Sequence, residues 1–268
     1  MTLPPRAALG TMHGKEAAIA PPLAAIGISL TVAPIDTDRF GTFTAETPRT
    51  GSMQDAARAK ALAAIAATGM PVGIASEGAY GPHPYRPFAA LGQELILWHD
   101  ARTGHEVAEW QTDPTPVYDH AEAATLDEAE PFLARVNFPA TALIVAPGPQ
   151  GAPIAKGIRD RAALADAMCG TPRAFLQTDM RAHMNPRRME VIATLATRLA
   201  LRLSTPCPAC AAPGWGLLRS DPGLPCSDCG TPTQFPAQDI HGCTACGHET
   251  AQPRPGAADP AHCPYCNP

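Results

Sequence analysis

Eight of the nine cysteines form four Cys-x-x-Cys pairs, and this spacing constrains the fold more than any other feature of the chain. Two thiolates three positions apart present both sulfurs to one ion, and two such pairs complete a closed tetrahedral site. The sequence therefore predicts two structural zinc ions near the C-terminus. The paired residues are Cys207/Cys210, Cys226/Cys229, Cys243/Cys246 and Cys263/Cys266.

The spacing between the pairs bears on which of them share an ion. They are separated by 15, 13 and 16 residues, which favours consecutive pairing, first with second and third with fourth. An arrangement in which the two middle pairs meet and the two outer pairs meet stays open. The pairs resemble the knuckles of zinc ribbons, as in Cys226-Ser227-Asp228-Cys229-Gly230, so we expect a double zinc ribbon at 206–268.

Charge narrows the range of partners. The 268 residues carry a net charge of −5, and within 206–268 the only basic residues are Arg219 and Arg254. A protein that follows a phosphate backbone needs clustered cations, so nucleic acid is not an expected partner. The ribbons are expected to be structural or to dock a protein partner.

No segment predicts membrane insertion or export. The longest apolar stretch, 17–33, is interrupted by Pro21 and Pro22 and is too polar to span a bilayer. The first ten residues, MTLPPRAALG, lack the apolar centre of a secretory signal. We therefore expect a cytoplasmic protein without a membrane partner.

The residues before the cysteine pairs alternate between strand-like and helix-like segments, which is typical of an α/β fold. We expect 1–205 to form an α/β domain with a mixed, twisted sheet flanked by helices. Two of the predicted helices are supported by N-cap residues, because Ser52 and Asn185 each precede a helical pattern. Strands are predicted at 7–11, 28–32, 72–75, 95–99, 106–111, 142–145 and 174–177, helices at 52–68, 126–136, 160–168 and 186–203, and loops at 113–124 and 147–153.

The chain contains only three lysines, Lys15, Lys60 and Lys156. Lys15 follows the first predicted strand at the opening of a helix, where backbone N–H groups and the helix dipole favour a phosphate. Lys60 lies on an alanine-rich helix, and Glu77 follows the strand at 72–75. Because a carboxylate at a strand end belongs in a sheet-edge crevice, these residues predict a phosphate site.

The order of these residues resembles the inosine/xanthosine triphosphate pyrophosphatases and Maf proteins over 6–84 and 178–200. In that superfamily a Thr/Ser-x-Asn-x-Gly-Lys loop holds phosphate; Thr11, Gly14 and Lys15 match it, with His13 in the place of the asparagine. The Ala-x-x-Lys-Ala segment of the superfamily matches 57–61, and its acidic-glycine turn matches 75–78. The whole chain also resembles a bacterial family of unknown function.

The resemblance implies a metal-dependent hydrolase of a nucleoside triphosphate or a related phosphoanhydride. It implies catalytic roles for Lys15 and Glu77, with Asp36 and Asp38 as further metal ligands or as the base that activates water. Phosphate binding is expected from Thr11, His13, Gly14, Lys15 and Lys60. Mg²⁺ or Mn²⁺ is expected on Glu46 and Glu77, and base or sugar recognition on Asp179, Arg181, His183 and Arg187.

A second function stays open, because a fold does not by itself imply an activity. In it, the α/β domain binds a nucleotide or another phosphorylated ligand without cleaving it, and the ribbons dock a protein. Convergence of Lys15, Lys60, Glu46 and Glu77 in one cleft would favour the enzyme.

Overall fold

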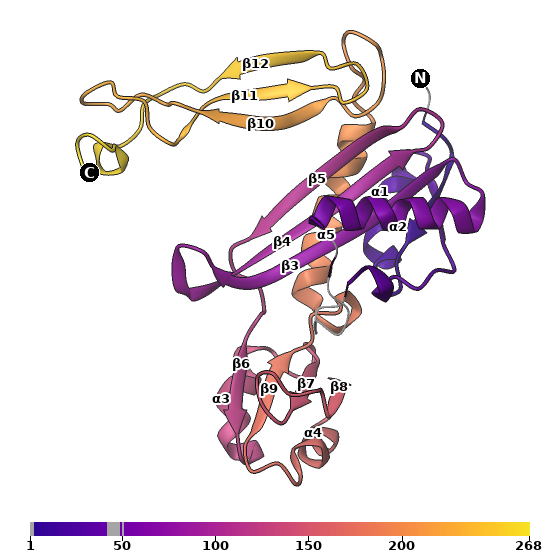
Figure 1. Ribbon diagram of the computed structural model, residues 1–268, viewed down its shortest axis with the longest axis vertical. Helices are drawn as coiled ribbons and strands as arrows, with labels where there is room; N and C mark the ends of the chain where they lie inside the picture. The colour runs from indigo at the N-terminus through magenta and orange to yellow at the C-terminus, as the bar shows by residue number, and fades with distance from the viewer. Residues whose placement is uncertain (1–2, 42–48, 50) are drawn as a thin grey trace. The chain divides into compact units, whose positions relative to one another are not determined.

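The structure, a computed structural model, describes residues 3–41, 49 and 51–268. Internal contacts divide the chain into a larger unit, 4–104 with 108–199, and a smaller unit formed mainly by 200–268 with 105–107. The described residues form five α-helices and twelve strands, whose order is shown in Figure 1. None of these helices is both long enough and apolar enough to cross a bilayer.

The larger unit is built on a mixed five-stranded sheet. Its strands are β1 (Arg6–Gly10), β2 (Ser29–Val32), β3 (Val72–His83), β4 (Arg86–Asp100) and β5 (His105–Asp113), in the order β2-β1-β3-β4-β5. β1 pairs in parallel with β2 and β3, whereas β3 and β4 form a long antiparallel hairpin. The mixture follows from the connections, since helices join the parallel strands and a tight turn joins the antiparallel pair.

Helices α1 (Glu16–Ala25) and α2 (Met53–Thr68) make the parallel connections. α2 begins with a capping box between Ser52 and Asp55. It packs very closely on the sheet, because a Cβ atom at Gly73 would lie 2.3 Å from the backbone oxygen of Ala61. The alanine-rich sequence of α2 and this glycine together bring the helix backbone against the strands.

The fifth helix, α5 (Pro186–Leu203), covers the other face of the sheet (Figure 1). In β4, Leu95 packs in one cluster with Ala61 of α2, while the adjacent Glu94 pairs with Arg188 of α5. Successive side chains of a strand point to opposite faces, so α2 and α5 lie on different sides of the sheet.

A second sheet of the larger unit is antiparallel and has its own core. Its strands are β6 (His120–Ala123), β7 (Leu143–Ala146), β8 (Ala155–Ile158) and β9 (Ala174–Thr178), in the order β6-β9-β7-β8. Helices α3 (Leu126–Arg135) and α4 (Arg161–Met168) begin at the N-caps Thr125 and Asp160. Apolar residues of these helices and strands form one buried cluster, including Phe132, Leu133, Leu143, Val145, Leu164 and Leu176.

The smaller unit contains a three-stranded antiparallel sheet of β10 (Gly216–Pro222), β11 (Pro236–Gly242) and β12 (Glu249–Pro253). All five residues of β12 are exposed, and β11 buries only Ile240 and Gly242. A unit with so little apolar core needs another source of stability, and bound metal ions can supply it.

The predicted helices are present, but two predictions about strands are wrong. The strand predicted at 72–75 continues to His83, so Ser76, Glu77 and Gly78 lie inside β3 and not in an acidic-glycine turn. Continuous pairing with β4 extends the strand, with Glu77 opposite Leu95. The polar residues after Ala75 adopt a strand conformation because β4 supplies the cross-strand packing.

The strands predicted at 142–145 and 174–177 also do not join the first sheet, because they belong to the separate antiparallel sheet as β7 and β9. The segment 113–124, predicted as a loop, contains β6, and β8 carries no sequence signal that predicted it. Both strands, HAEA and AKGI, have only four residues, and they form through pairing with β9 and β7.

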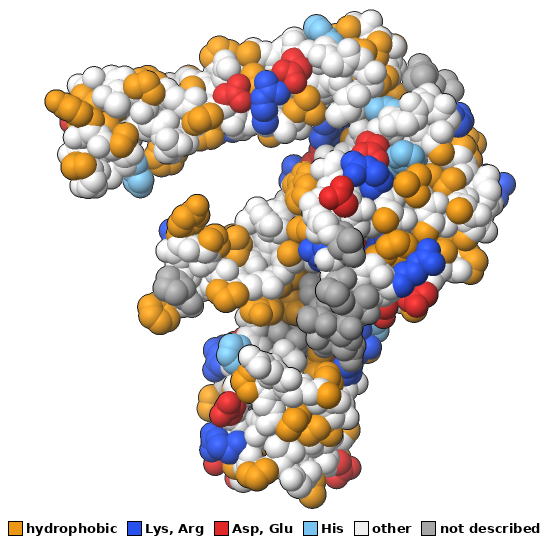
Figure 2. Space-filling model, in the orientation of Figure 1, with side chains coloured by type: hydrophobic (Ala, Val, Ile, Leu, Met, Phe, Trp, Pro, Cys, Tyr) orange, Lys and Arg blue, Asp and Glu red, His pale blue; other side chains and the backbone are white. Residues whose placement is uncertain are grey.

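The β3–β4 hairpin ends outside the core. Tyr85 and Phe88 near its turn are 89% and 104% exposed. Figure 2 shows the hydrophobic side chains that gather at this end of the hairpin. The exposed hydrophobic side chains at the hairpin tip are therefore not part of the core of the larger unit.

Candidate functional site

Two groups of four cysteines in the smaller unit fit a tetrahedral zinc ion. In each group the four sulfurs lie within 4.8 Å of one another, and sulfur pairs between knuckles are 3.6 to 3.9 Å apart. Zn–S bonds of about 2.3 Å in a tetrahedron separate the sulfurs by about 3.8 Å. Each group can therefore hold one zinc ion without rearrangement. The groups are Cys207, Cys210, Cys243 and Cys246, and Cys226, Cys229, Cys263 and Cys266.

The cysteine pairs are interleaved, first with third and second with fourth, so the predicted consecutive pairing is wrong. The middle-with-middle alternative is not found either. The antiparallel sheet is the reason, because β10 leads from the first pair to the second and β11 returns to the third. A strand of seven residues spans about 23 Å, so consecutive pairs lie at opposite ends of the sheet.

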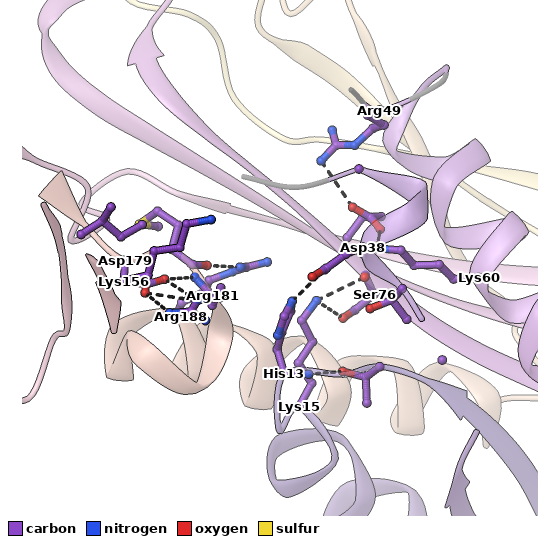
Figure 3. Close-up of a pocket in the computed structure, with 17 residues that line it drawn as sticks. His13, Lys15, Asp38, Arg49, Lys60, Ser76, Lys156, Asp179, Arg181 and Arg188 are labelled. Carbon is purple, nitrogen blue, oxygen red and sulfur yellow. Dashed lines mark hydrogen bonds and ion pairs between the residues drawn. The ribbon is translucent and has the colours of Figure 1, made fainter. Parts of the chain in front are cut away.

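The larger unit contains a charged pocket beyond the carboxyl end of β1 (Figure 3). β1 ends at Gly10 opposite Ala75 of β3, and Ser76 and Glu77 continue past it. The cavity there measures about 160 Å³, which is room for on the order of ten water molecules. Its polar lining comprises Thr11, His13, Lys15, Thr37, Asp38, Arg49, Lys60, Ser76, Glu77, Lys156, Asp179, Arg181 and Arg188.

Lys15 is a buried amine in this pocket, with 6% of the residue exposed. Its Nζ donates to the backbone oxygen of Ser76 at 3.2 Å and to Ser76 Oγ at 2.9 Å. Burial lowers the pKa of Lys15 to about 7, and the Arg188 and Lys60 cations contribute to the decrease, which Glu94 partly opposes. Near neutral pH, Lys15 is therefore divided between the amine and the ammonium form.

Glu77 lies between two cations in the same pocket. Lys60 Nζ forms an ion pair with Glu77 Oε1, and Arg49 Nη2 is 3.3 Å from Glu77 Oε2. The Lys60 and Glu77 side chains are only 10% and 8% exposed, so the pair is largely desolvated. The structure thus brings together Lys15, Lys60 and Glu77, three members of the phosphate site expected from the sequence.

His13 and Asp38 form a hydrogen-bonded pair, with His13 Nε2 3.2 Å from Asp38 Oδ1. The His13 ring stacks on His183 at a centroid distance of 5.5 Å. Burial lowers the pKa of His13, an effect that Asp38 opposes and Lys15 reinforces. Burial, together with Arg181, also lowers the pKa of His183. Both imidazoles are therefore mainly neutral at pH 7.

Two arginines with carboxylate partners complete the lining. Arg181 Nη2 is 2.6 Å from Asp179 Oδ2, and its Nε is 3.1 Å from Asp179 Oδ1, which makes a bidentate pair. Arg188 of α5 pairs with Glu94 of β4 and donates to the backbone oxygen of Met180. Asp179 and Arg188 are 0% and 1% exposed, so these charges are fixed by the interior of the fold.

Four other residues of the predicted site have different places. Gly14 has φ +66 and lies against His183, where a Cβ would be 3.3 Å from the His183 Cβ. Asp36 is not part of the described lining and accepts a hydrogen bond from the Asp38 N–H. Arg187 is not part of it either and forms a bidentate pair with Asp113. Glu46 lies outside the described residues.

Five polar lining residues had no role predicted from the sequence: Thr37, Arg49, Ser76, Lys156 and Arg188. The rarity of lysine was a signal for Lys156. Helical periodicity was a signal for Arg188, which shares the buried face of α5 with Ile192 and Leu195. Nothing local marks Ser76 or Arg49, because their neighbours in the pocket come from distant segments.

Comparison with known proteins adds one match. The model of a family described as a domain of unknown function matches residues 60–268, a range that contains Lys60, Ser76 and both cysteine groups. No curated protein and no solved structure matches the chain.

Proposed function

The chain belongs to the DUF6671 family, a domain of unknown function, and from its pocket we propose that it is a hydrolase of a nucleoside triphosphate or a related phosphoanhydride. The substrate phosphates would occupy the cavity beyond the carboxyl end of β1. In open α/β sheets, ligands commonly bind in such a crevice.

One observation carries the proposal: all three lysines of the chain line this single cavity. Lys15 comes from the loop after β1, Lys60 from α2 and Lys156 from β8. The chain has 20 lysines and arginines together, so arginine supplies its other cations. An ammonium is a compact point charge that can contact phosphate oxygens from several directions, and it can also lose its proton. Both properties are useful at a site that binds and cleaves a phosphoanhydride.

The charge balance of the lining supports an anionic ligand. The three lysines, of which Lys15 is only partly protonated near pH 7, are joined by Arg49, Arg181 and Arg188, whereas the carboxylates that line the cavity or pair with its cations are Asp38, Glu77, Asp179 and Glu94. An excess of cations in a buried cavity is costly unless anions neutralise it. The phosphates of a phosphoanhydride supply several negative charges and many acceptor oxygens. Cations held around them also stabilise the charge that develops during phosphoryl transfer.

The His13–Asp38 pair supplies a base for hydrolysis. With Nε2 hydrogen-bonded to Asp38, the Nδ1 atom of a neutral His13 can accept a proton from water. The lowered pKa of His13 keeps the ring neutral at pH 7, as a base must be. His13, which lines the cavity, is therefore the residue that we assign to activate the water that completes the reaction.

The described residues do not form a ready site for Mg²⁺ or Mn²⁺. Within the described chain, converging groups of three or more His, Cys, Asp or Glu side chains occur only at the two cysteine clusters. Glu77 is already engaged by Lys60 and Arg49. The steps that we propose use the cations of the protein, and the screen below compares hydrolysis with and without Mg²⁺ or Mn²⁺.

The test is a screen for phosphate and pyrophosphate release across nucleoside triphosphates, with zinc-loaded protein. Divalent ions are omitted from one arm and supplied as Mg²⁺ or Mn²⁺ in others; a chelator is avoided because it would remove the structural zinc. We expect Lys60→Met and Lys156→Met each to weaken binding of the nucleotide that the screen identifies as the substrate by about tenfold or more. The matched control is Arg173→Met, which removes an exposed cation that pairs with Glu128 outside the pocket.

Binding without release of phosphate would contradict the hydrolase and support the second candidate, a phospho-ligand-binding module. A complete lack of binding to nucleotides, inorganic pyrophosphate and inorganic phosphate would contradict both. A protein partner of the zinc ribbons is compatible with either activity, and the negative charge of 206–268 favours a basic surface on that partner.

A further inference from the structure

We propose that Ser76 is the nucleophile of this hydrolase and that Lys15 accepts its proton, an inference that rests on the proposed function. A serine hydroxyl is a weak nucleophile until an adjacent base takes its proton. Serine–lysine pairs perform this chemistry on folds unrelated to the serine proteases. Ser76 and Lys15 have the required relationship, because Ser76 Oγ lies 2.9 Å from Lys15 Nζ.

The position of the pair supports a reaction rather than a structural contact. Both residues line the cavity, yet Ser76 and Lys15 are only 3% and 6% exposed. Ser76 lies just past the point where β1 ends beside β3, so among the described strands it has no pairing partner on that side. Ser76 lines the cavity in which we place the phosphates. Figure 3 shows Lys15 and Ser76 joined by the hydrogen bond at the cavity.

The surroundings of Lys15 favour its neutral amine. The charged groups that face it are Arg188 from α5, Glu94 from β4, Lys60 from α2 and Glu77 from β3. His13, on its own loop, is the other titratable neighbour. Burial among these groups lowers the pKa of Lys15 to about 7, so a large fraction is unprotonated just above neutral pH. Arginine cannot replace lysine in this role, because it keeps its proton.

The reaction then has two balanced steps. Ser76 Oγ attacks one phosphorus atom as the hydroxyl proton moves to Lys15 Nζ; the Oγ–P bond forms, and the bridging P–O bond breaks with its electron pair on the departing phosphate. Water next attacks the phosphoserine and gives a proton to His13. The Oγ–P bond breaks, Ser76 Oγ recovers the proton from the Lys15 ammonium, and His13 returns its proton to solvent. The net change is hydrolysis of one phosphoanhydride bond.

A fluorophosphonate probe tests the nucleophile without a nucleotide, because it phosphonylates activated serines and releases fluoride. We expect one probe per wild-type chain, located on Ser76 by peptide mass spectrometry, at a rate that rises as the pH passes about 7. Lys15→Arg keeps a cation but removes the base, and we expect labelling to slow by about 100-fold or more. The control Ser204→Ala removes an exposed hydroxyl that donates to the Ala200 carbonyl of α5 outside the cavity, and we expect no change in the rate.

Substrate experiments separate the inference from the proposed function. With the hydrolysed nucleotide, rapid acid quench should trap a phosphoserine at residue 76, and Ser76→Ala should abolish it. If Ser76→Ala hydrolysed the nucleotide at the wild-type rate, Ser76 would not be the nucleophile. The proposed hydrolase activity would remain, with direct attack by water. If the probe labelled Ser76 but the protein hydrolysed no phosphoanhydride, the proposed substrate class would be wrong. The assignment of Ser76 as an activated nucleophile would remain. Absence of both probe labelling and phosphoserine in folded, zinc-loaded wild type would overturn the inference.

Discussion

The Arg188 guanidinium and the Glu94 carboxylate form an ion pair in which the two side chains are 1% and 0% exposed. Tyr80 donates its hydroxyl to the same carboxylate at 2.8 Å. The pair joins α5 to β4 and holds one of the cations that line the pocket. It therefore connects the stability of the fold to the electrostatics of the site.

Removing one member of this pair should destabilise the protein strongly. We expect Glu94→Gln to lower the free energy of unfolding by about 3–5 kcal/mol, because the Arg188 charge would stay buried without its partner. The double variant Glu94→Gln with Arg188→Met should lose less than the sum of the single variants. Chemical denaturation measures both effects, and Glu130→Gln, at an exposed pair with Arg161, is the control expected to unfold like wild type. Additive losses would contradict a coupled pair.

The interleaved zinc groups predict an unusual pattern of metal loss. Cys210→Ser with Cys243→Ser alters one group and should leave one zinc ion per chain, whereas Cys210→Ser with Cys229→Ser alters both groups and should leave none. Elemental analysis of protein purified without chelator measures the zinc content. Consecutive pairing would produce the reverse order, so the two double variants serve as controls for each other.

Glycine at position 78 is required by close packing. A Cβ there would lie 2.5 Å from Arg188 Nη2 and 2.7 Å from Glu94 Oε1, whereas a Cβ at Gly81 of the same strand would meet nothing within 4 Å. We expect Gly78→Ala to destabilise the fold by about 1–3 kcal/mol and Gly81→Ala to have little effect. Thermal and chemical unfolding of the two variants provide the comparison. Equal stabilities would show that the Arg188 side chain moves aside at no cost.

The pKa of Lys15 can be measured directly, because the chain has only three lysines. With ¹³Cε-labelled lysine, three NMR signals are expected, and one should titrate near pH 7. Lys15→Arg should remove that signal alone. A titration of the Lys15 signal near its ordinary value of 10.5 would contradict the proposed base.

The lowered pKa of Lys15 makes the free energy of unfolding depend on pH. Because the folded pKa of Lys15 is below its ordinary value, the unfolded chain binds more protons between about pH 7 and 10.5, and stability rises with pH over this range. Lys15→Met removes the buried charge. The variant should therefore exceed wild type in free energy of unfolding by a larger amount at pH 6 than at pH 9. Denaturation at the two pH values measures this difference, and a pH-independent difference would contradict the shift.

Local patterns were sufficient for much of this architecture. Ser52 and Asn185 marked the starts of α2 and α5 because capping depends on a few adjacent residues. The Cys-x-x-Cys spacing predicted two metal-binding groups because two ligands of one ion lie within a single turn. The rarity of lysine was a signal for the pocket, because all three lysines of the chain line it.

Contacts between distant segments decided the rest. Cys210 and Cys243 are 33 positions apart, and Lys15 and Ser76 are 61 apart. Their meeting depends on strand direction and on where β1 ends beside β3, which no local spacing encodes. The sequence by itself determined which side chains could hold a metal or a phosphate, since that is a property of chemistry and short-range geometry. Only the tertiary structure decided which of them share one site, because strand pairing and helix packing act over the whole chain.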